Sequence, residues 1–394
     1  MAEPFFPSKE STLPFWRTEP HELDTHRSTP ELPKTCDILI IGAGYAGITS
    51  AYHILKSLEG KGSSPNIVLV EARQACSGAT GRNGGHLRPA VYSLLPEYIR
   101  NYGISAAAEV AAFEDTHVRT IADLVAEEKI DCDFTLTKSF DVHSNVEKAK
   151  AAKQAYDELK ANGVAKSTID GLIWTDADRA EECGEQGAEP ANQHAGYLTV
   201  SQFRSVDRHN GKRGKIHPAR GICSRIVVPP GSKHPPLTSS YGLRPEGVGL
   251  DYLIPRNDGS IIVGGARSRF RTHREQWHSV TDDSTLITPA ENYFDGYMQR
   301  NFLGWEDSGA TVDRVWTGIM GYNSDSLPSV GEVPGREGCF VIAGFEGHGM
   351  PVVYLTAKGV AQMVGDGVAY EDAGIPLVYK TTKERLESDR DDYA

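Results

Sequence analysis

Apolar runs alternate with glycine-rich turns and with segments of helical periodicity along this chain. The run Cys36–Ile41 is short and rich in isoleucine, which favours a buried strand of a parallel sheet. A glycine-rich turn follows, and apolar residues then recur at helical spacing as far as Leu58. A second apolar run, Asn66–Val70, follows a polar turn. This order predicts a strand–helix–strand unit with parallel strands.

The rest of the chain continues this mixed pattern. Apolar residues at helical spacing predict helices over 101–129 and 145–161. Two apolar runs around Asn257-Asp258-Gly259 predict a β-hairpin within 247–269. Near the C-terminus, a strand over 339–345, a glycine-rich loop and a helix beginning near Pro351 repeat the order of the first unit. The tail beyond Pro376 is polar, and we expect it to be solvated.

The first glycine-rich turn has the spacing G-x-G-x-x-G, with a strand before it and a helix after it. Its residues are Gly42, Ala43, Gly44, Tyr45, Ala46 and Gly47. The three glycines permit a tight turn, close approach of a pyrophosphate and close helix–strand packing, while the helix N-terminus offers free N–H groups. Glu71 ends the second strand, 24 residues after Gly47, where a carboxylate accepts hydrogen bonds from a ribose. The sequence therefore predicts a dinucleotide site.

Two more glycine-rich loops indicate which dinucleotide binds. One reads "CSGATGRNGGH" (76–86), and the other reads "GFEGHGM" (344–350). Bare loops that are remote in sequence are best explained by one long ligand that touches both, and FAD has that length. An NAD(P)-dependent dehydrogenase that uses only the first turn is the less favoured alternative, since it has no need of the C-terminal loop. Two independent structural turns are a further alternative.

Composition narrows the class of protein. The formal net charge of -12 over 394 residues argues against nucleic acid or an anionic membrane as the main partner. The six cysteines are scattered without paired spacing, so neither a disulfide scaffold nor a metal site is expected. No apolar run reaches the roughly 18 residues of a membrane span. Neither a secretory signal nor a peroxisomal C-terminus is recognisable, and a cytoplasmic location is expected.

Four segments together resemble one enzyme superfamily. They are "DILIIGAGYAGITSAY", "CSGATGRNGGHLRP", "YLIPRNDGSIIVGG" and "VWTGIMGYNSDSLPSVGEVPGREGCFVIAGFEGHGM". Their combination resembles the D-amino-acid-oxidase-like FAD-dependent oxidoreductases, which include glycine, sarcosine and γ-glutamylputrescine oxidases. The N-terminal "PFWRTEPHELDTHRSTPELP" is similar to an extension of fungal members.

The resemblance implies an α/β fold and a reaction class. A Rossmann-type FAD-binding domain would be assembled from distant segments, beside an α+β substrate domain with a large antiparallel sheet. The reaction implied is oxidation of a C–N bond of a small amine or amino-acid derivative by hydride transfer to flavin. Oxygen or another acceptor would reoxidise the flavin.

The resemblance also assigns roles to individual residues. Gly42, Gly44, Gly47 and Glu71 would hold the ADP half of FAD. The passage from pyrophosphate to flavin would be lined by Thr80, Gly81, Arg82, Asn83, Gly84 and Gly85. The flavin ring would meet Gly344, Gly347, His348, Gly349 and Met350. Tyr252 and His86 are candidate substrate contacts, and no catalytic residue is assigned.

Two departures from the family pattern bear on the ligands. Relatives that bind an α-amino acid often carry an arginine where this chain has Met320, which favours an amine or an amino-acid derivative over a free amino acid. Sarcosine-oxidase relatives attach flavin to a cysteine where this chain has Gly318, so non-covalent FAD is expected.

A third departure concerns the domain plan. We expect an extension over 1–34, an FAD-binding domain over 35–95 and 312–372, a substrate domain over 96–180 and 216–311, and a tail over 373–394. The middle part of the flavin domain is missing near 181–215, including one edge of the nucleotide-binding sheet. A truncated member that binds FAD poorly or not at all is therefore the main alternative.

Overall fold

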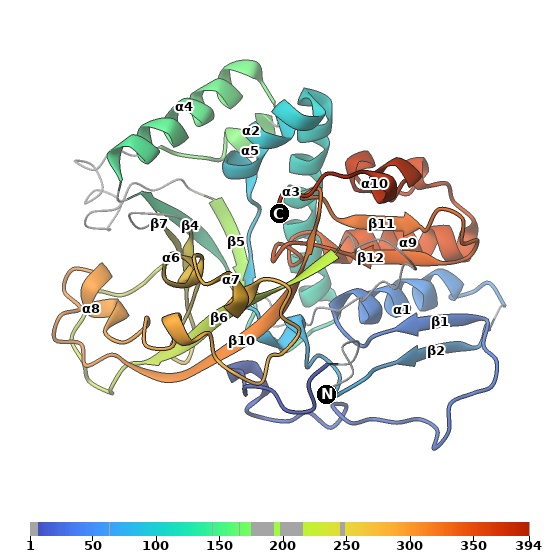
Figure 1. Ribbon diagram of the computed structural model, residues 1–394, viewed down its shortest axis with the longest axis horizontal. Coiled ribbons are helices and arrows are strands. Elements are labelled where there is room, and N and C mark those ends of the chain that lie inside the picture. Colours follow the sequence, from blue (N-terminus) through green and yellow to red (C-terminus); the bar gives the residue numbers. More distant parts are fainter. Residues whose placement is uncertain are drawn as a thin grey trace.

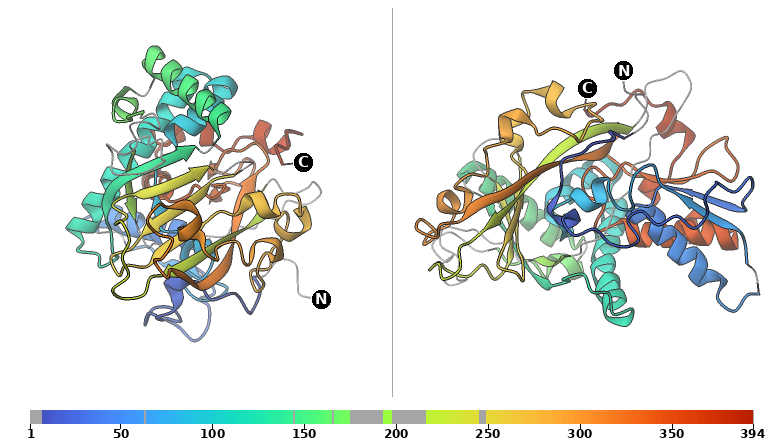
Figure 2. Two further views of the ribbon diagram at one scale, coloured as in Figure 1. Left: turned by 90° about the vertical axis from the view of Figure 1, so that its left-hand side faces the viewer. Right: turned by 90° about the horizontal axis from the view of Figure 1, so that it is seen from below.

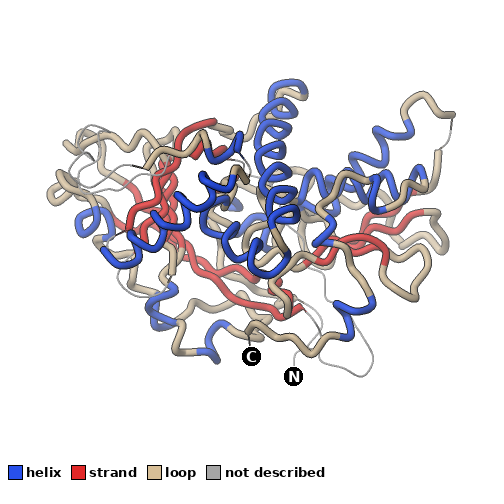
Figure 3. The backbone as a smooth tube through the Cα atoms, turned by 90° about the horizontal axis from the view of Figure 1, so that it is seen from above, coloured by secondary structure: helices blue, strands red, loops and turns tan. Residues whose placement is uncertain are grey.

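The computed structural model describes residues 7–62, 64–143, 145–164, 166–174, 193–197, 216–244 and 249–393. A large sheet occupies one side of the molecule, and two small strand pairs with helices α1 and α9 occupy the other (Figure 1). Helix α3 stands between the two sides (Figures 1 and 3). The fold is α/β, as the sequence predicts.

The first predicted unit is present. β1 (Ile38–Ile41) and β2 (Ile67–Val70) pair in parallel, and α1 (Tyr45–Leu58) connects them. The C-terminal repeat of this order is also present, since β12 (Phe340–Ala343) is followed by α9 (Val353–Asp366). β12 pairs antiparallel with β11 (Ser329–Glu332) rather than with β1. Packing of α1 against α9 therefore joins the two units.

One edge of β1 has no partner strand within the described part of the chain. β1 pairs with β2 alone, and its side chains Leu39 and Ile41 are 53% and 66% exposed. A parallel strand is normally buried on both faces, so exposed leucine and isoleucine are unusual in one. The sequence predicts that one edge of the nucleotide-binding sheet is missing near 181–215, and this stays a prediction. Of the segment 181–215, only 193–197 is described.

The large sheet has eight strands in the order β10-β6-β9-β8-β7-β4-β5-β3. Its strands are β3 (His86–Leu87), β4 (Leu136–His143), β5 (Gln193–Tyr197), β6 (Ile216–Val227), β7 (Ser240–Arg244), β8 (Asp251–Pro255), β9 (Ile261–Gly264) and β10 (Thr311–Asn323). The pairing is antiparallel except between β4 and β7. The β8–β9 pair is the predicted hairpin. The long strands β6 and β10 run side by side towards the helical half (Figure 2).

The remaining helices include both of those predicted from periodicity. The α-helices not yet named are α2 (Val91–Tyr102), α3 (Ile104–Glu127), α4 (Val146–Asn162), α5 (Lys166–Ile169), α6 (Arg267–Phe270), α7 (Arg274–Trp277), α8 (Tyr297–Asn301) and α10 (Lys383–Glu387). Short 3₁₀ helices are η1 (Phe15–Arg17), η2 (Ala79–Arg82), η4 (Thr288–Ala290), η5 (Tyr370–Asp372) and η6 (Leu377–Tyr379). The helix predicted over 101–129 begins only at Ile104, because Gly103 adopts a φ of +87° and separates α2 from α3. The second predicted helix is confirmed as α4.

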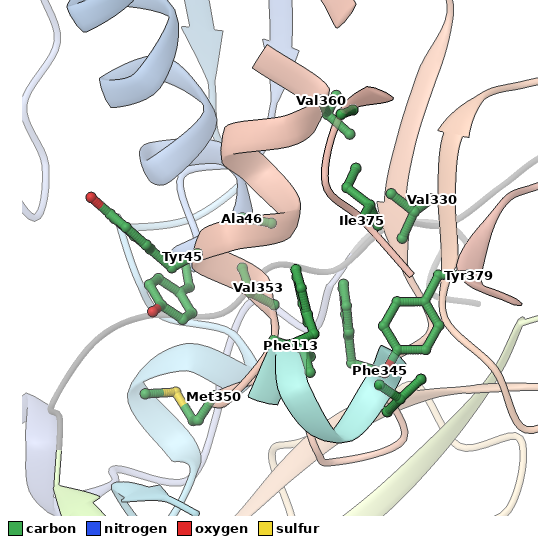
Figure 4. Packing of buried hydrophobic residues seen from close by; sticks show 14 of the residues in the cluster. Tyr45, Ala46, Phe113, Val330, Phe345, Met350, Val353, Val360, Ile375 and Tyr379 are labelled. Atoms are coloured by element: carbon green, nitrogen blue, oxygen red, sulfur yellow. The ribbon is translucent and has the colours of Figure 1, made fainter. Parts of the chain in front are cut away.

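The hydrophobic core around α1, α3 and α9 is built from four segments that are distant in sequence. Figure 4 shows side chains of α1, α3, α9 and the C-terminal segment in one cluster, among them Ala46, Phe113, Val353 and Tyr379. Tyr379 is only 1% exposed. The prediction of a solvated tail beyond Pro376 is therefore wrong: its polar composition concealed a buried tyrosine.

A buried histidine within this core predicts acid sensitivity. His117 is fully buried beside Phe113 and Tyr354, and neither ring nitrogen has a hydrogen-bond partner among the described residues. Burial lowers its pKa to about 3. The unfolded chain therefore binds the extra proton below the ordinary pKa of 6.5, and stability falls as the pH drops from there towards 3.

We expect His117→Leu to remove this part of the pH dependence. The slope of unfolding free energy against pH, measured by denaturant titration between pH 4 and 6, should fall by about 1.4 kcal/mol per pH unit. His273→Leu is the control, since that side chain is 51% exposed and should leave the slope unchanged. Equal slopes in wild type and His117→Leu would contradict the prediction.

The described residues lack two kinds of feature. None of their helices combines the length and apolarity needed to span a bilayer. No group of three or more histidine, cysteine, aspartate or glutamate side chains among them could hold a metal ion.

Candidate active site

The first glycine turn forms a tight strand-to-helix junction. Gly42 adopts a φ of +105°, and a Cβ on Gly47 would lie 1.9 Å from the Gly42 carbonyl oxygen. Helix α1 starts after Gly44 without a side-chain cap, so the N-terminal N–H groups are not satisfied by an N-cap side chain. The Tyr45 N–H donates to Thr80 Oγ1 at 3.2 Å. This contact joins the turn to the glycine-rich loop 76–86.

Glu71 lies at this turn. Its Oε2 accepts from the Ala43 N–H at 2.9 Å, and its Oε1 accepts from the N–H groups of Ala72 and Arg73. The residue is exposed. The carboxylate is thus fixed in orientation by the backbone, while its outer side remains accessible to a ribose.

The glycines of the loop 76–86 are required by close protein contacts. A Cβ on Gly84 would lie 2.3 Å from the Tyr252 ring, and one on Gly81 would lie 2.5 Å from the Cys76 carbonyl oxygen. Gly85 has a φ of +82° and faces the Trp16 ring. Aromatic side chains from other parts of the chain therefore account for two of these glycines, which the sequence pattern alone does not reveal.

Arg82 and Asn83 hold the loop in shape. The buried Arg82 guanidinium donates to the carbonyl oxygens of Ser77 and Thr317, both at 2.8 Å. Asn83 Oδ1 accepts from the Gly85 N–H at 2.7 Å. These side chains fix the backbone that a flavin would pass.

The N-terminal extension fastens the same loop, a role that sequence reasoning missed. Trp16 Nε1 donates to the Asn83 carbonyl oxygen at 2.6 Å, and Arg17 donates to the Ala75 carbonyl oxygen at 2.7 Å. The neighbouring Phe15 ring lies against the Arg225 and Arg256 guanidinium groups. The aromatic pair Phe15-Trp16 within a polar extension was the available signal.

Trp16→Ala should therefore loosen the loop. We expect the free energy of unfolding to fall by about 1–2 kcal/mol, below the range for a fully buried tryptophan because Trp16 is half-buried. Denaturant titration measures this, with Leu13→Ala as the control because Leu13 is 51% exposed. Equal losses in both variants would rule out a specific role for Trp16.

The second glycine-rich loop lies between β12 and α9. Gly344 and Gly347 adopt φ values of +75° and +80°, and a Cβ on Gly347 would lie 2.8 Å from the Met320 sulfur. His348 Nε2 lies 3.0 Å from Glu114 Oε1 on α3. The loop therefore approaches β10 on one side and α3 on the other.

One cavity of about 530 Å³ brings the two loops together. Its lining includes Ala79, Arg82, Asn83, Gly84 and His86 from the loop 76–86, Glu346, Gly347, His348 and Met350 from the loop before α9, Gly318, Ile319, Met320 and Tyr322 from β10, and Arg220, Cys223, Arg244, Tyr252 and Arg267 from β6, β7, β8 and α6. Of the predicted site residues, those of the first turn (42–47), Glu71, Thr80, Gly81, Gly85, Gly344 and Gly349 do not line it.

Both candidate substrate contacts lie at this cavity and are engaged by the protein. The Tyr252 hydroxyl lies 2.9 Å from Cys223 Sγ, and burial raises the pKa of Tyr252 well above its ordinary value. His86 Nε2 lies 2.8 Å from Ser240 Oγ, and burial lowers the pKa of His86 to about 3. Both side chains are therefore neutral near pH 7.

These residues fit FAD. The glycines at 42, 44 and 47 let a pyrophosphate approach the start of α1, although the Ala43 and Tyr45 N–H groups already donate to Glu71 and Thr80. The exposed Glu71 suits a ribose. A volume of about 530 Å³ is within the usual range for a cofactor or small-molecule pocket. Among the described residues, the unpaired edge of β1 and the separate β11–β12 pair depart from a complete dinucleotide fold.

Comparison with known proteins agrees with this geometry. The family model described as DAO, FAD dependent oxidoreductase, matches residues 37–201 and 195–363. A Bacillus subtilis (strain 168) protein, YhfW, described as a Rieske 2Fe-2S iron-sulfur protein, is 28% identical over 168 residues. Gamma-glutamylputrescine oxidoreductase of Escherichia coli (strain K12) is 29% identical over 100 residues. These matches cover 42% and 25% of this chain, and only 31% and 22% of the relatives' own lengths.

A solved structure shares the fold over most of the chain. L-amino acid deaminase from Proteus vulgaris, solved without its specific insertion sequence, matches with a TM-score of 0.61 at 16% identity. The match covers 92% of this chain and 98% of that chain. Since the family model spans most of the sequence, the chain belongs to the DAO family of FAD-dependent oxidoreductases.

Proposed function

We propose that this protein oxidises a C–N bond of an amine or amino-acid derivative, with FAD held non-covalently. The observation that carries the proposal is the single cavity lined by Asn83 and Gly84 of one glycine-rich loop and by Gly347 and Met350 of the other. Gamma-glutamylputrescine oxidoreductase and L-amino acid deaminase are named for amine and amino-acid substrates, which supports the same substrate class.

The division of labour follows from this arrangement. The two glycine-rich loops would hold FAD, whose chemistry would be acceptance of hydride from the carbon of the C–N bond, with oxygen or another acceptor as the oxidant that restores it. The chain orients the two reactants: the Tyr252 ring, packed between Gly84 and Gly264, forms a rigid wall. Buried aromatic and apolar walls also exclude water, which strengthens electrostatic contacts to the substrate.

The polar lining bears on the substrate. Met320 lines the cavity at the position where relatives often carry an arginine. Methionine offers no hydrogen-bond donor to a substrate carboxylate. The Arg88 and Arg244 guanidinium groups both pair with buried Asp141. The Arg267 guanidinium lies over the Trp277 ring and interacts electrostatically with the Tyr322 hydroxyl. Arg267 lines the cavity, where its positive charge suits an acidic group elsewhere on the substrate. This favours an amino-acid derivative.

Non-covalent attachment is supported by two observations. Gly318, which stands where relatives attach flavin through cysteine, lines the cavity without a thiol. Burial raises the pKa of Cys223 to about 12, so that thiol is protonated near pH 7 and is a weak nucleophile.

The absorption spectrum of the purified protein tests the proposal. We expect flavin absorption that is released to the supernatant on acid precipitation, followed by bleaching under anaerobic conditions with at least one member of an amine panel. Flavin that stays with the precipitate would overturn non-covalent binding.

A soluble protein that stays colourless after incubation with FAD would instead support the truncated, inactive alternative. The exposed Leu39 and Ile41 on the unpaired edge of β1 are the observation that favours this second reading.

A further inference from the structure

Positive charge is concentrated in the cavity wall of an otherwise acidic chain. Among the described residues that line the cavity, one side chain, Glu346, is acidic, whereas six are arginines: Arg82, Arg88, Arg220, Arg244, Arg267 and Arg271. The formal net charge of the whole chain is -12. A cavity of this kind attracts anions that the rest of the surface repels.

Four of these arginines are held by other groups of the protein. Ion pairs hold three of them, which are Arg82 with Asp283, and Arg88 and Arg244 with Asp141. Arg220 donates to the backbone carbonyl oxygens of Gln276, Asp282 and Thr285. Arg267 and Arg271 differ from these four, since neither forms an ion pair with an acidic side chain in the described part of the chain.

The Arg267 guanidinium is held at the cavity wall by two aromatic side chains. It lies 5.1 Å from the centre of the Trp277 ring and interacts electrostatically with the Tyr322 hydroxyl. Trp277 and Tyr322 both line the cavity, so the charged group lies between two of its lining side chains. The Arg271 N–H donates to the Arg267 carbonyl oxygen at 3.0 Å, which places Arg271 one helical turn further on the same side.

Asp251 fixes the start of the segment that carries these two arginines. Its Oδ1 accepts from the Ala266 N–H at 2.8 Å, and its Oδ2 accepts from the Tyr293 and Tyr297 hydroxyls at 2.6 and 3.0 Å. Ala266 is fully buried and adopts a φ of +56°, a left-handed conformation that is uncommon for alanine. Arg267 follows directly, so its backbone is fixed before a ligand binds, and the cost of ordering it on binding is small.

Met320 fills the position at which relatives that bind an α-amino acid often carry an arginine. A Cβ on Gly221 would lie 2.9 Å from Met320 Cε, and a Cβ on Gly347 would lie 2.8 Å from its sulfur. The methionine side chain therefore occupies the space between β6 and the loop before α9, and it offers no donor to a carboxylate. An acidic group on the substrate then needs a cation at another place in the wall, and Arg267 supplies one.

We propose that Arg267 and Arg271 form a subsite for a carboxylate that the amine substrate carries away from its reacting C–N bond. The proposal rests on the proposed function and names its substrate class: ω-amino acids and other amines with a remote carboxylate. The planar Arg267 guanidinium donates to the carboxylate, and the Trp277 ring beside it keeps water from one side of the pair. The exposed Arg271 draws the anion towards the cavity.

Calorimetric binding of 3-phenylpropanoate to the flavin-loaded protein tests the subsite. This probe carries a carboxylate and no amine, so it binds without being oxidised at a C–N bond. Arg267→Gln should weaken binding by roughly 10–100-fold, because charge-assisted hydrogen bonds are lost. Arg267→Lys should weaken it less, since the charge stays and only the planar fork is removed. Arg271→Gln should also have a smaller effect, because this side chain is exposed.

Two controls accompany this titration. Arg269→Gln removes the same charge from the same helical turn, but Arg269 lies over the Tyr293 ring at 5.6 Å and does not line the cavity. It should bind 3-phenylpropanoate as wild type does. The uncharged 3-phenylpropanamide should bind equally to all variants.

Anaerobic bleaching of the flavin tests the substrate class. At limiting concentration, at least one ω-amino acid between 3-aminopropanoate and 6-aminohexanoate should bleach the wild-type flavin roughly 10-fold faster than pentylamine or 2-aminopentanoate. Arg267→Gln should remove this preference by raising the concentration needed for half-maximal bleaching, with little change in the maximal rate.

The outcomes separate this inference from the proposed function. A wild-type protein without FAD, or a flavin that no amine bleaches, would overturn the proposed function and the substrate class with it. Bleaching by amines together with equal 3-phenylpropanoate binding by wild type and Arg267→Gln would overturn the inference alone, as would pentylamine that bleaches as fast as every ω-amino acid. If Arg267→Gln does not fold, Arg267→Lys and Arg271→Gln decide the question, and unchanged binding in both counts against the subsite.

Discussion

Asp283→Asn is expected to lower the free energy of unfolding by about 3–5 kcal/mol, the usual loss when one partner of a buried ion pair is removed. Asp283 is only 1% exposed, and both its carboxylate oxygens accept from the Arg73 guanidinium, at 3.1 and 3.0 Å. Arg82 Nε lies 3.5 Å from the same carboxylate. Asparagine keeps the size of the side chain but leaves two largely buried guanidinium groups without a carboxylate.

The same change should reach the cofactor site. Asp283 comes from the segment before η4, whereas Arg73 precedes the glycine-rich loop 76–86 and Arg82 lies within it. Loss of the carboxylate therefore frees the loop, and FAD content should fall along with stability. Denaturant titration and the flavin-to-protein absorbance ratio measure the two effects.

Asp282→Asn provides the matched control for this prediction. Asp282 is exposed, and its side chain accepts from the Ser284 N–H. We expect a change within about 0.5 kcal/mol, as is typical at the surface. If both variants lose similar stability, the buried ion pair is not the cause.

The parts of the fold that the sequence predicts are those specified by local pattern. Gly42, Gly44 and Gly47 lie between an apolar strand and a periodic helix, and the structure has β1, the turn and α1 in that order. The turn Asn257-Asp258-Gly259 likewise marks the β8–β9 hairpin. In each case a few consecutive residues carry the signal, because backbone geometry at a turn depends on the residues in it.

Contacts between distant segments were not predictable in this way. Trp16 meets Asn83, Asp283 meets Arg73, and Tyr393 meets Glu346, and in each pair one residue lies in a polar stretch without periodicity. A polar composition favours the expectation that such a stretch is exposed to solvent. It cannot indicate which single side chain within the stretch is buried. The site therefore depends on both chain termini, which a reading of local pattern assigns to the surface.

The free edge of β1 bears on a prediction that stays open. The sequence predicts that this chain lacks part of the family's nucleotide-binding sheet near 181–215. Among the described residues, β1 pairs only with β2, and its side chains Leu39 and Ile41 are exposed. An unpaired edge leaves backbone donors and acceptors without partners. Whether FAD binds therefore depends on whether α1 and its glycine turn hold their geometry with β2 as the neighbouring strand.

Gly47→Val tests that dependence most directly. A Cβ at this position would lie 1.9 Å from the Gly42 carbonyl oxygen and 3.3 Å from the Ile40 side chain, so α1 must move away from β1. Because the obstacle is backbone, no side-chain rotation relieves it. We expect a loss of about 3 kcal/mol in the free energy of unfolding, at the upper end for overpacking. FAD affinity should fall by roughly 10–100-fold, because the N–H groups at the start of α1 move with the helix.

Gly365→Val distinguishes this steric effect from a general cost of valine in a helix. Gly365 lies on α9, the helix that packs against α1, and its Cβ would lie 3.4 Å from Ser57 Oγ, an ordinary contact. Valine and glycine differ by only about 0.5 kcal/mol in helix propensity, so this variant should retain stability and FAD. Titration of FAD into the apoprotein, followed by flavin fluorescence, measures the affinity of each variant. A Gly47→Val protein that binds FAD as tightly as Gly365→Val would show that the cofactor is not held at the first glycine turn, and the assignment of residues 42–47 would then be withdrawn.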